Sequence, residues 1–185
     1  MQALADDVMH SDRAHEHDAQ TDAGDAAAQQ HLQLVIGDEP YAVPIASVRE
    51  IIEVGRMTAL PMTPDFVRGV MNLRGVVIPV IDINARFGRG PTQIGRRSCI
   101  VIVELSGRRG AGESGIVGAL VDAVSEVIDI APSDVEPPPA LGTRIAPQFI
   151  AGMAHVGEGL VIVLDLAHTL AEDEIAALIE SHVHA

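Results

Sequence analysis

From His31 onward, short runs rich in Val, Ile and Leu alternate with clusters of Gly, Pro and Asp every 8 to 15 residues. Such runs favour strands and the breakers between them favour turns, so the spacing is typical of an all-β barrel or sandwich. The expected strands are residues 32–37, 40–43, 50–54, 67–73, 76–81, 99–105, 115–121, 124–130, 150–156 and 160–164. Gly37-Asp38-Glu39-Pro40 supplies a hairpin turn between the first two.

The chain also repeats itself. Shifting residues 66–87 by 83 positions lays them on residues 149–170 without a gap. The identical pairs are Phe66 and Phe149, Gly69 and Gly152, Val80 and Val163, and Asp82 and Asp165. Residues 48–54 lie over 124–130 at a shift of 76. Two matches in the same order indicate duplication, so we predict two small five-stranded β-barrels packed together, a mainly β fold with short helices.

Helix signals are few. Thr169 followed by Glu172 resembles a capping box, which predicts a C-terminal helix from about residue 170 to 181. Asp82 and Asp165 each end a strand, and we interpret them as helix N-caps rather than as a catalytic carboxylate pair, because strand-to-helix exits favour Asp.

Composition sets the domain boundaries and narrows the function classes. Residues 1–30 carry seven acidic residues against one Arg and show no sustained apolar period, so we expect a disordered acidic tail, then one domain over 31–181 and a short tail over 182–185. His10, His15 and His17 could bind a metal weakly, but a solvated tail lacks the fixed geometry of a metal site, and we expect no cofactor.

The net charge of -14 disfavours binding to nucleic acids and to anionic membranes. One cysteine, Cys99, excludes an intramolecular disulfide and fits a reducing compartment. No window holds the roughly 18 to 20 apolar residues of a membrane span, and the first 25 residues are acidic where a secretory signal is basic, so we expect a cytoplasmic protein.

One arginine interrupts an apolar stretch, VMNLRGVVIPVIDI over residues 70–83. Asn72 suits the first position of a turn and Gly75 the last, which puts Leu73-Arg74 at the tip between two strands. Pro79 cannot donate to a ladder, so its strand is expected at an edge or bulge. Arg74 would then project from a rigid corner, suited to bidentate recognition of a partner's carboxylate or carbonyls. The alternative is a solvated turn arginine.

Together, LVIGDEPY (34–41), VREII (48–52), PMTPDFVRG (61–69), NLRG (72–75) with VVIPVIDI, and GIVGALVDAVSEV (115–127) resemble the CheW family of chemotaxis coupling proteins. The resemblance runs in order from about residue 31 to 179. It implies two intertwined, SH3-like β-barrel subdomains with a shared core and no catalytic site. It also implies a scaffold that bridges the cytoplasmic tip of a methyl-accepting chemoreceptor to the regulatory domain of a CheA-type histidine kinase.

The resemblance carries site residues with it. In the family the receptor's tip helices lie in the groove between the barrels, and the NLRG arginine grips them, so Arg74 would be the polar anchor. Gly69 and Gly75 would let a helix approach closely. The further groove positions are Val48, Glu50, Cys99 and Val127. The alternative for Val48, Cys99 and Val127 is that they are ordinary residues of the hydrophobic core with no role in binding. The kinase contact would use barrel ends and strand edges on both halves.

Two other functions remain open. A coupling protein of a twitching-motility or other non-flagellar pathway would share these motifs. An enzyme or small-ligand-binding barrel would use the loop 107–115 with Arg108 and Arg109. The letters GxGxxG at 110–115 are followed by the β-branched stretch IVGALVD, which favours a strand where a phosphate site needs a helix N-terminus, so a hairpin loop is the better interpretation.

Overall fold

The computed structural model describes residues 26–105, 115–140, 142–170, 174 and 177. Its strands are β1 Gln29–Ile36, β2 Glu39–Pro44, β3 Val48–Glu53, β4 Val67–Leu73, β5 Val76–Asp82, β6 Cys99–Leu105, β7 Gly115–Val121, β8 Ala123–Ile130, β9 Val135–Glu136, β10 Ile150–Val156 and β11 Gly159–Leu164. The helices are α1 Ile83–Arg86 and α2 Leu166–Leu170, with 3-10 turns η1 Ile45–Ser47, η2 Pro132–Asp134 and η3 Pro147–Phe149.

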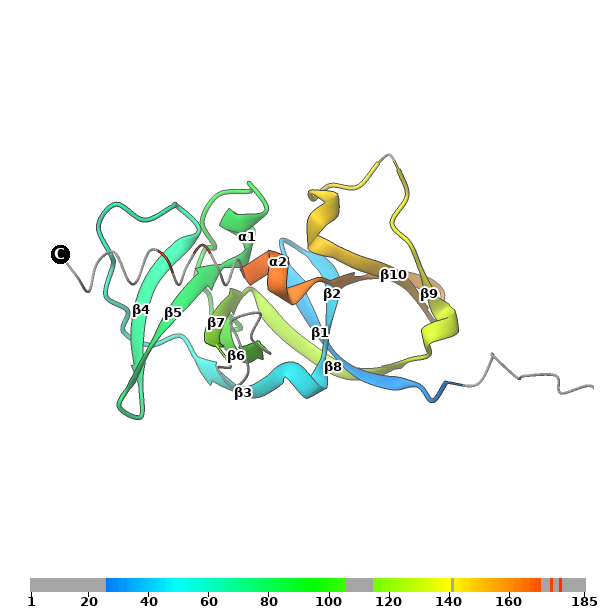
Figure 1. Ribbon diagram of the computed structural model, residues 1–185, viewed down its shortest axis with the longest axis horizontal. Coiled ribbons are helices and arrows are strands. Elements are labelled where there is room, and N and C mark those ends of the chain that lie inside the picture. Colours follow the sequence, from blue (N-terminus) through cyan, green and yellow to red (C-terminus); the bar gives the residue numbers. More distant parts are fainter. Residues whose placement is uncertain (1–25, 106–114, 141, 171–173, 175–176, 178–185) are drawn as a thin grey trace, which may run out of the picture.

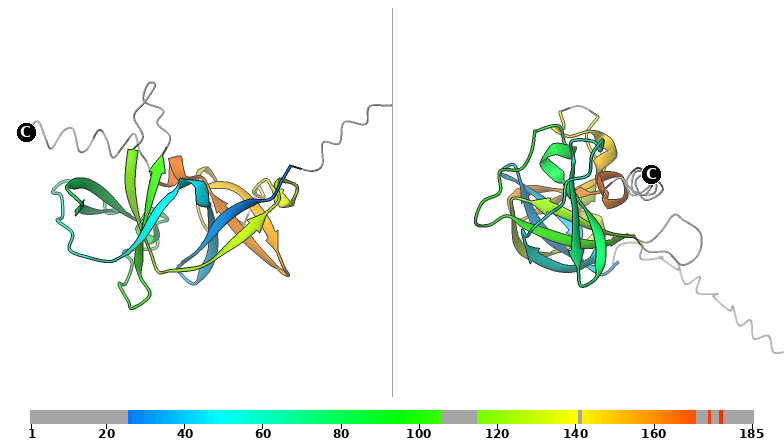
Figure 2. Two further views of the ribbon diagram at one scale, coloured as in Figure 1. Left: turned by 90° about the horizontal axis from the view of Figure 1, so that it is seen from below. Right: turned by 90° about the vertical axis from the view of Figure 1, so that its left-hand side faces the viewer.

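The strands form two curled sheets that follow one another along the long axis of the molecule (Figure 1). Sheet A has the order β8-β1-β2-β11-β10-β9, and sheet B has the order β3-β6-β7-β5-β4. The mainly β fold predicted from the sequence is confirmed, and each expected run contains a strand, although β1 begins three residues before the predicted Leu32. Figure 2 shows the sheets as two units joined at the middle.

Within the described residues, no continuous ladder closes either sheet into a barrel. In sheet B the segment after β3 returns to the far edge and pairs with β4 through one bridge, Thr58 to Val70. In sheet A the segment after β8 does the same, because β9 follows β8 through η2 and pairs with β10. Sheet A, with six strands, and sheet B, with five, are therefore strongly curled, and in each a short connection joins the two edges.

Each sheet takes strands from both repeats. Sheet A combines β1 and β2 with β8, β10 and β11 from the second half of the chain, and sheet B combines β6 and β7 with β3, β4 and β5 from the first. Read in order, β8-β1-β2-β11-β10 corresponds strand for strand to β3-β6-β7-β5-β4. The duplicated units have thus exchanged strands, and neither half of the chain builds a sheet alone.

The repeat extends to single hydrogen bonds. The N-cap prediction is confirmed at both sites, since the Asp82 carboxylate accepts from the Ala85 amide at 3.2 Å and the Asp165 carboxylate from the His168 amide at 3.1 Å. The cap at Asp165 means that the last helix begins earlier than the sequence predicted. The sequence predicted its cap at Thr169, whereas α2 begins at Leu166 because Asp165 already satisfies its first turn. Most of the helix predicted over 170–181 lies outside the described residues.

The largest hydrophobic cluster lies between the sheets and is built from both of them. It includes Leu34 and Tyr41 of sheet A, Ile81 and Val101 of sheet B, and Phe149. A smaller cluster fills the inside of each curled sheet. Of the helices in the described part of the chain, none combines the length and apolarity that crossing a bilayer requires.

Candidate functional site

The β4–β5 hairpin carries the arginine singled out from the sequence. Its last paired residues are Leu73 and Val76, so Arg74 and Gly75 form a two-residue loop. The predicted tip, Leu73-Arg74, is wrong by one residue. Arg74 has φ 51° and Gly75 φ 87°, the pattern of a type I′ turn, whose backbone twist matches the strands it joins. The Asn72 side chain accepts a hydrogen bond from the Gly75 amide at 2.8 Å and fixes this turn.

Arg74 occupies a backbone conformation that disfavours large L-residues, because its Cβ approaches the neighbouring carbonyl at positive φ. Asn or Gly would suit the position better, so the arginine is kept there against local preference, as at many functional sites. Its side chain is 74% exposed. It donates two parallel hydrogen bonds to Glu50, Nη1 to Oε1 at 2.6 Å and Nη2 to Oε2 at 2.7 Å.

The Arg74–Glu50 pair joins two of the residues predicted for the site. The hydrogen bonds from Arg74 hold the pKa of the Glu50 carboxyl below its ordinary 4.5, so the pair is ionised at neutral pH. Exposed ion pairs contribute little net stability, because water solvates the separated charges almost as well. The guanidinium therefore has a bidentate partner in this structure and can exchange it for another carboxylate at low cost.

Beside the pair is a hollow of about 180 Å³. Its lining comes entirely from sheet B: Arg49, Glu50, Leu73, Arg74, Val76, Ile78, Ile102 and Ile116. The floor is apolar and the rim is charged, which suits a partner that inserts an apolar side chain next to a carboxylate. The family resemblance implied that Arg74 borders a groove between the two units, whereas this hollow lies within one of them.

Of the predicted glycines, Gly75 is open and Gly69 is not. A Cβ built on Gly75 meets nothing within 4 Å, whereas one on Gly69 would lie 2.3 Å from the Thr58 carbonyl oxygen. Gly69 thus makes room for the connection that joins the edges of sheet B. Its repeat equivalent, Gly152, does the same for Val135 in sheet A. The chain's own packing explains the glycine at 69 without a partner.

The remaining predicted residues are spread over both sheets. Val48 and Cys99 are half-buried and pack against the shared core, which fits the plain-core alternative. Burial raises the pKa of the Cys99 thiol, so its reactive thiolate form is scarce. Val127 is 49% exposed on β8, paired with Leu32 in sheet A. The structure therefore brings together Arg74, Gly75 and Glu50 but not Val127.

Sequence reasoning missed most of the apolar floor. Ile102 and Ile116 lie inside strands that were predicted, but the sequence does not reveal which strands face each other across the curl of sheet B. Arg49 and Glu50 both line the hollow although they are neighbours on β3, because a bulge between Val48 and Glu50 interrupts the alternation of faces there. Arg49 pairs with Glu104 at 2.9 Å.

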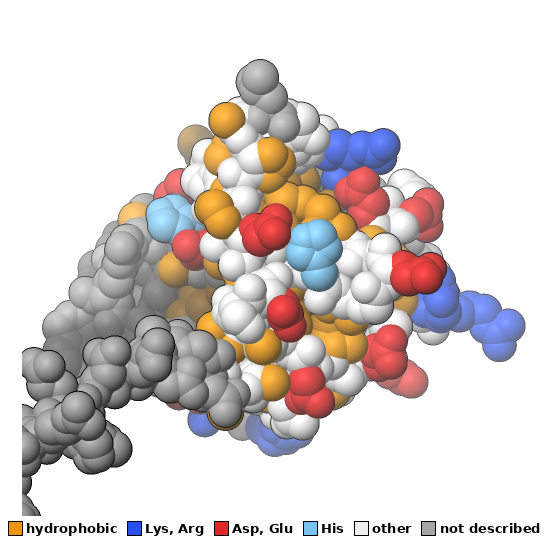
Figure 3. All heavy atoms as spheres, turned by 90° about the vertical axis from the view of Figure 1, so that its right-hand side faces the viewer, with side chains coloured by type: hydrophobic (Ala, Val, Ile, Leu, Met, Phe, Trp, Pro, Cys, Tyr) orange, Lys and Arg blue, Asp and Glu red, His pale blue; other side chains and the backbone are white. Residues whose placement is uncertain are grey.

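The opposite end of the molecule has a different character. Figure 3 shows that acidic and histidine side chains are scattered among hydrophobic ones across the face at the sheet A end, rather than gathered in one patch. Exposed apolar side chains of sheet A include Val127 and Leu160. This surface suits contact with a protein better than contact with an extended polyanion.

Comparison with known proteins agrees with this picture. Residues 30–174 match the family model of the CheW-like domain. The chain is 30% identical over 154 residues to the chemotaxis protein CheW of Klebsiella aerogenes, a match that covers 83% of this chain and 89% of that protein. It is 33% identical over 142 residues to the probable chemotaxis protein CheW of Rhizobium etli, covering 77% and 87%. The scaffolding protein TtCheW of Thermoanaerobacter tengcongensis has a solved structure similar to this one, with a TM-score of 0.67 and 35% identity over 78% of this chain and 88% of that one.

Proposed function

The chain belongs to the CheW-like domain family, and on that premise we propose that it is a chemotaxis coupling adaptor that joins a methyl-accepting chemoreceptor to a CheA-type histidine kinase. The similar solved structure is titled a scaffolding protein, which supports a role as a scaffold rather than an enzyme. The proposed site of action is the cytoplasm, where receptor tip and kinase meet. No cofactor is required for this role.

The observation that carries the proposal is Arg74 on the β4–β5 turn. A guanidinium that is exposed, held on a rigid two-residue loop and already oriented by a bidentate carboxylate is preorganised for a second carboxylate of the same geometry. A carboxylate on the receptor's helical tip would replace Glu50 on Arg74, and an apolar neighbour on that helix would enter the adjacent hollow.

Of the predicted receptor contacts, Arg74, Gly75 and Glu50 make up this surface, and Val48 begins the strand that carries Glu50. Cys99, Val127 and Gly69 remain predictions that this arrangement does not require. The kinase regulatory domain would bind at the ends and edges of the sheets. The mechanism is positional, since holding both partners in one fixed relation lets a small receptor rearrangement bias the kinase.

A pull-down with a receptor cytoplasmic hairpin tests the proposal. Charge reversal by Arg74→Glu places two carboxylates together, so we expect binding to fall by roughly tenfold or more while the fold is kept. Arg144→Glu is the matched control, because Arg144 is 80% exposed and ion-paired with Glu39 at 3.0 Å, away from the hollow. Equal binding by the two variants would refute the assignment of Arg74.

A further inference from the structure

The two sheets meet where α1, at the end of β5, lies beside α2, at the end of β11 (Figure 1). Arg86, the last residue of α1, reaches across this joint. Its side chain is 14% exposed, and its Nη2 donates to the His168 carbonyl oxygen of α2 at 3.1 Å. Its Nη1 lies 3.5 Å from the Glu174 carboxylate. Arg86 therefore links the first repeat to the last segment of the second.

The same guanidinium touches both repeats through aromatic rings. Its Cζ lies 4.3 Å from the ring centroid of Phe66 and 5.1 Å from that of Phe149. These two rings occupy equivalent positions in the duplicated sequence, one before β4 of sheet B and one before β10 of sheet A. Both distances lie within the range of cation–π attraction, so one cation holds the matching edge of each unit.

The joint is not symmetric. At the shift of 83 the equivalent of Arg86 is Thr169, a short side chain where the other repeat has a long one. Among the described residues, Arg86 Nε and Thr169 Oγ1 are the buried side-chain polar atoms without a hydrogen-bond partner. Buried polar atoms are nearly always paired, so two orphans at equivalent positions mark a contact that is not fully optimised.

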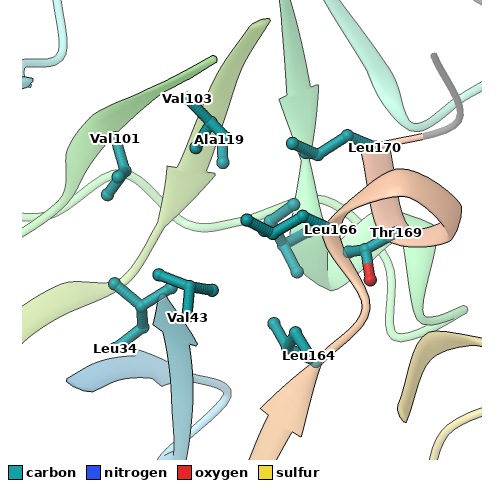
Figure 4. Close-up of a pocket in the computed structure, with 10 residues that line it drawn as sticks. Leu34, Val43, Val101, Val103, Ala119, Leu164, Leu166, Thr169 and Leu170 are labelled. Atoms are coloured by element: carbon teal, nitrogen blue, oxygen red, sulfur yellow. The ribbon is translucent and has the colours of Figure 1, made fainter. Parts of the chain in front are cut away.

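Packing at the joint is incomplete on the Thr169 side. Thr169 lines a small apolar cavity of about 10 Å³ between the sheets, together with residues of both of them (Figure 4). A void leaves its lining without partner atoms, which weakens resistance to small shifts. On the other side of α1, the Asp122 carboxylate accepts from the Gly37 amide and from the Asn84 side chain, both at 2.7 Å. Arg89, three residues after Arg86, also crosses the joint and donates to Glu39 at 2.6 Å and to the Tyr41 hydroxyl at 3.0 Å in sheet A. The Asp122 and Arg89 connections together can serve as a pivot.

We propose that Arg86 is a positioning residue, a latch that fixes the orientation of sheet A relative to sheet B. Without it the sheets undergo a small rotation about the other polar connections of the joint, while the shared core and the exchanged strands keep the molecule folded. The consequence for signalling rests on the proposed adaptor function, because an adaptor transmits a receptor state only while its two halves hold their partners in a fixed relation.

The test measures the distance between the sheets in the full chain. Spin labels replace Glu53 on β3 and Glu158 in the β10–β11 turn, both exposed, in a Cys99→Ala background, and pulsed electron–electron resonance gives the distance distribution. We expect one narrow distribution for the parent. Arg86→Met should widen it roughly twofold or add a second distance, as expected for a released rigid-body motion. Arg86→Lys keeps the positive charge but loses the planar guanidinium with its several donors, so the width of its distance distribution should lie between those of the parent and Arg86→Met.

Arg68→Met is the matched control. Arg68 is also partly buried and pairs with Asp82 at 3.1 Å, but both residues belong to sheet B, so its loss should lower the melting temperature and leave the distribution unchanged. A distribution for Arg86→Met no wider than that for Arg68→Met would overturn the latch. If Arg86→Met does not fold, the distribution for Arg86→Lys is compared with that for Arg68→Met in its place, and the same criterion applies.

A functional readout separates this inference from the proposed function. Arg86→Lys should still capture a receptor hairpin, because Arg74 and its hollow lie within sheet B, but should lose most stimulation of the kinase. Failure of the parent protein to bind a receptor would refute the adaptor. The distance measurement would still decide the latch, since it needs no partner.

Discussion

Tyr41 allows a test at the scale of one residue, because it is the only tyrosine in a chain without tryptophan. It is fully buried, and its hydroxyl donates to Glu39 at 2.8 Å and accepts from Arg89 at 3.0 Å. Burial, reinforced by the bond to Glu39, raises the pKa of Tyr41 to about 12. Absorbance at 295 nm should therefore show one ionisation with a midpoint near that value.

The same shift predicts how stability depends on pH. A pKa raised on folding means that the neutral phenol stabilises the native state, so the contribution is complete below the ordinary pKa of 10.0 and is lost as pH rises through about 12. The loss amounts to up to about 3 kcal/mol. Tyr41→Phe should remove this alkaline decline in urea titrations. An unchanged decline would contradict the assignment.

Glu50 provides a second residue-scale prediction. Its pKa lies below 4.5 because Arg74 donates to it, so the pair persists until pH falls through that lowered value. Arg74→Gln removes the charged donor, and the Glu50 midpoint should then move up toward 4.5 in a carbon-detected NMR titration. An identical midpoint in both proteins would mean that the pair does not form in solution.

At the scale of elements, Gly69 and Gly75 of the β4–β5 hairpin are required for different reasons, the first for lack of space and the second for its backbone conformation. Gly69→Ala would drive a methyl group into the Thr58 carbonyl at φ 144°, so it should destabilise the fold by roughly 3 kcal/mol or more. The methyl group of Gly75→Ala would meet no other atom, so only the positive φ should lower the free energy of unfolding, by about 1–2 kcal/mol. Gly95→Ala, with neither constraint, should stay within about 0.5 kcal/mol.

Denaturant unfolding checks this order. Equal effects at positions 69 and 75 would show that the connection after β3 does not pack on β4 as described. The comparison also bears on function, because it separates a glycine required by the chain itself from one that only shapes the turn presenting Arg74.

Elements were predictable from the sequence where local chemistry decides them. The strands follow from β-branched runs, and the caps at Asp82 and Asp165 follow from the preference of strand-to-helix exits for Asp. The errors arose where two local signals compete. The N-cap of α2 is Asp165 and not Thr169, which was the predicted cap. The β4–β5 turn lies one residue later than predicted, because Gly75 readily adopts the positive φ that the second turn position requires.

The site was only partly predictable for a different reason. Arg74 stands out in sequence as a charge within an apolar run, but its pairing with Glu50 depends on β3 lying in the same sheet as the β4–β5 hairpin. That neighbourhood spans 24 positions in the chain and is set by the curl of the sheet. Periodicity along one strand carries no information about it.

At the scale of the whole molecule, strand exchange between the repeats predicts cooperative unfolding. Removing either half would strip strands from both sheets, so the chain should unfold in one transition with equal calorimetric and van't Hoff enthalpies. A fragment of residues 26–105 should remain unfolded. Two separate transitions, or a folded fragment, would show that each repeat is stable alone.

The most direct test of the adaptor is reconstitution of the whole assembly from receptor cytoplasmic fragments, a CheA-type kinase and this protein, with kinase autophosphorylation as the readout. We expect that receptor raises kinase activity only when the protein is present, and that Arg74→Glu removes the effect while Arg144→Glu retains it. Receptor control of the kinase that is the same with and without the protein, or that survives Arg74→Glu intact, would contradict it.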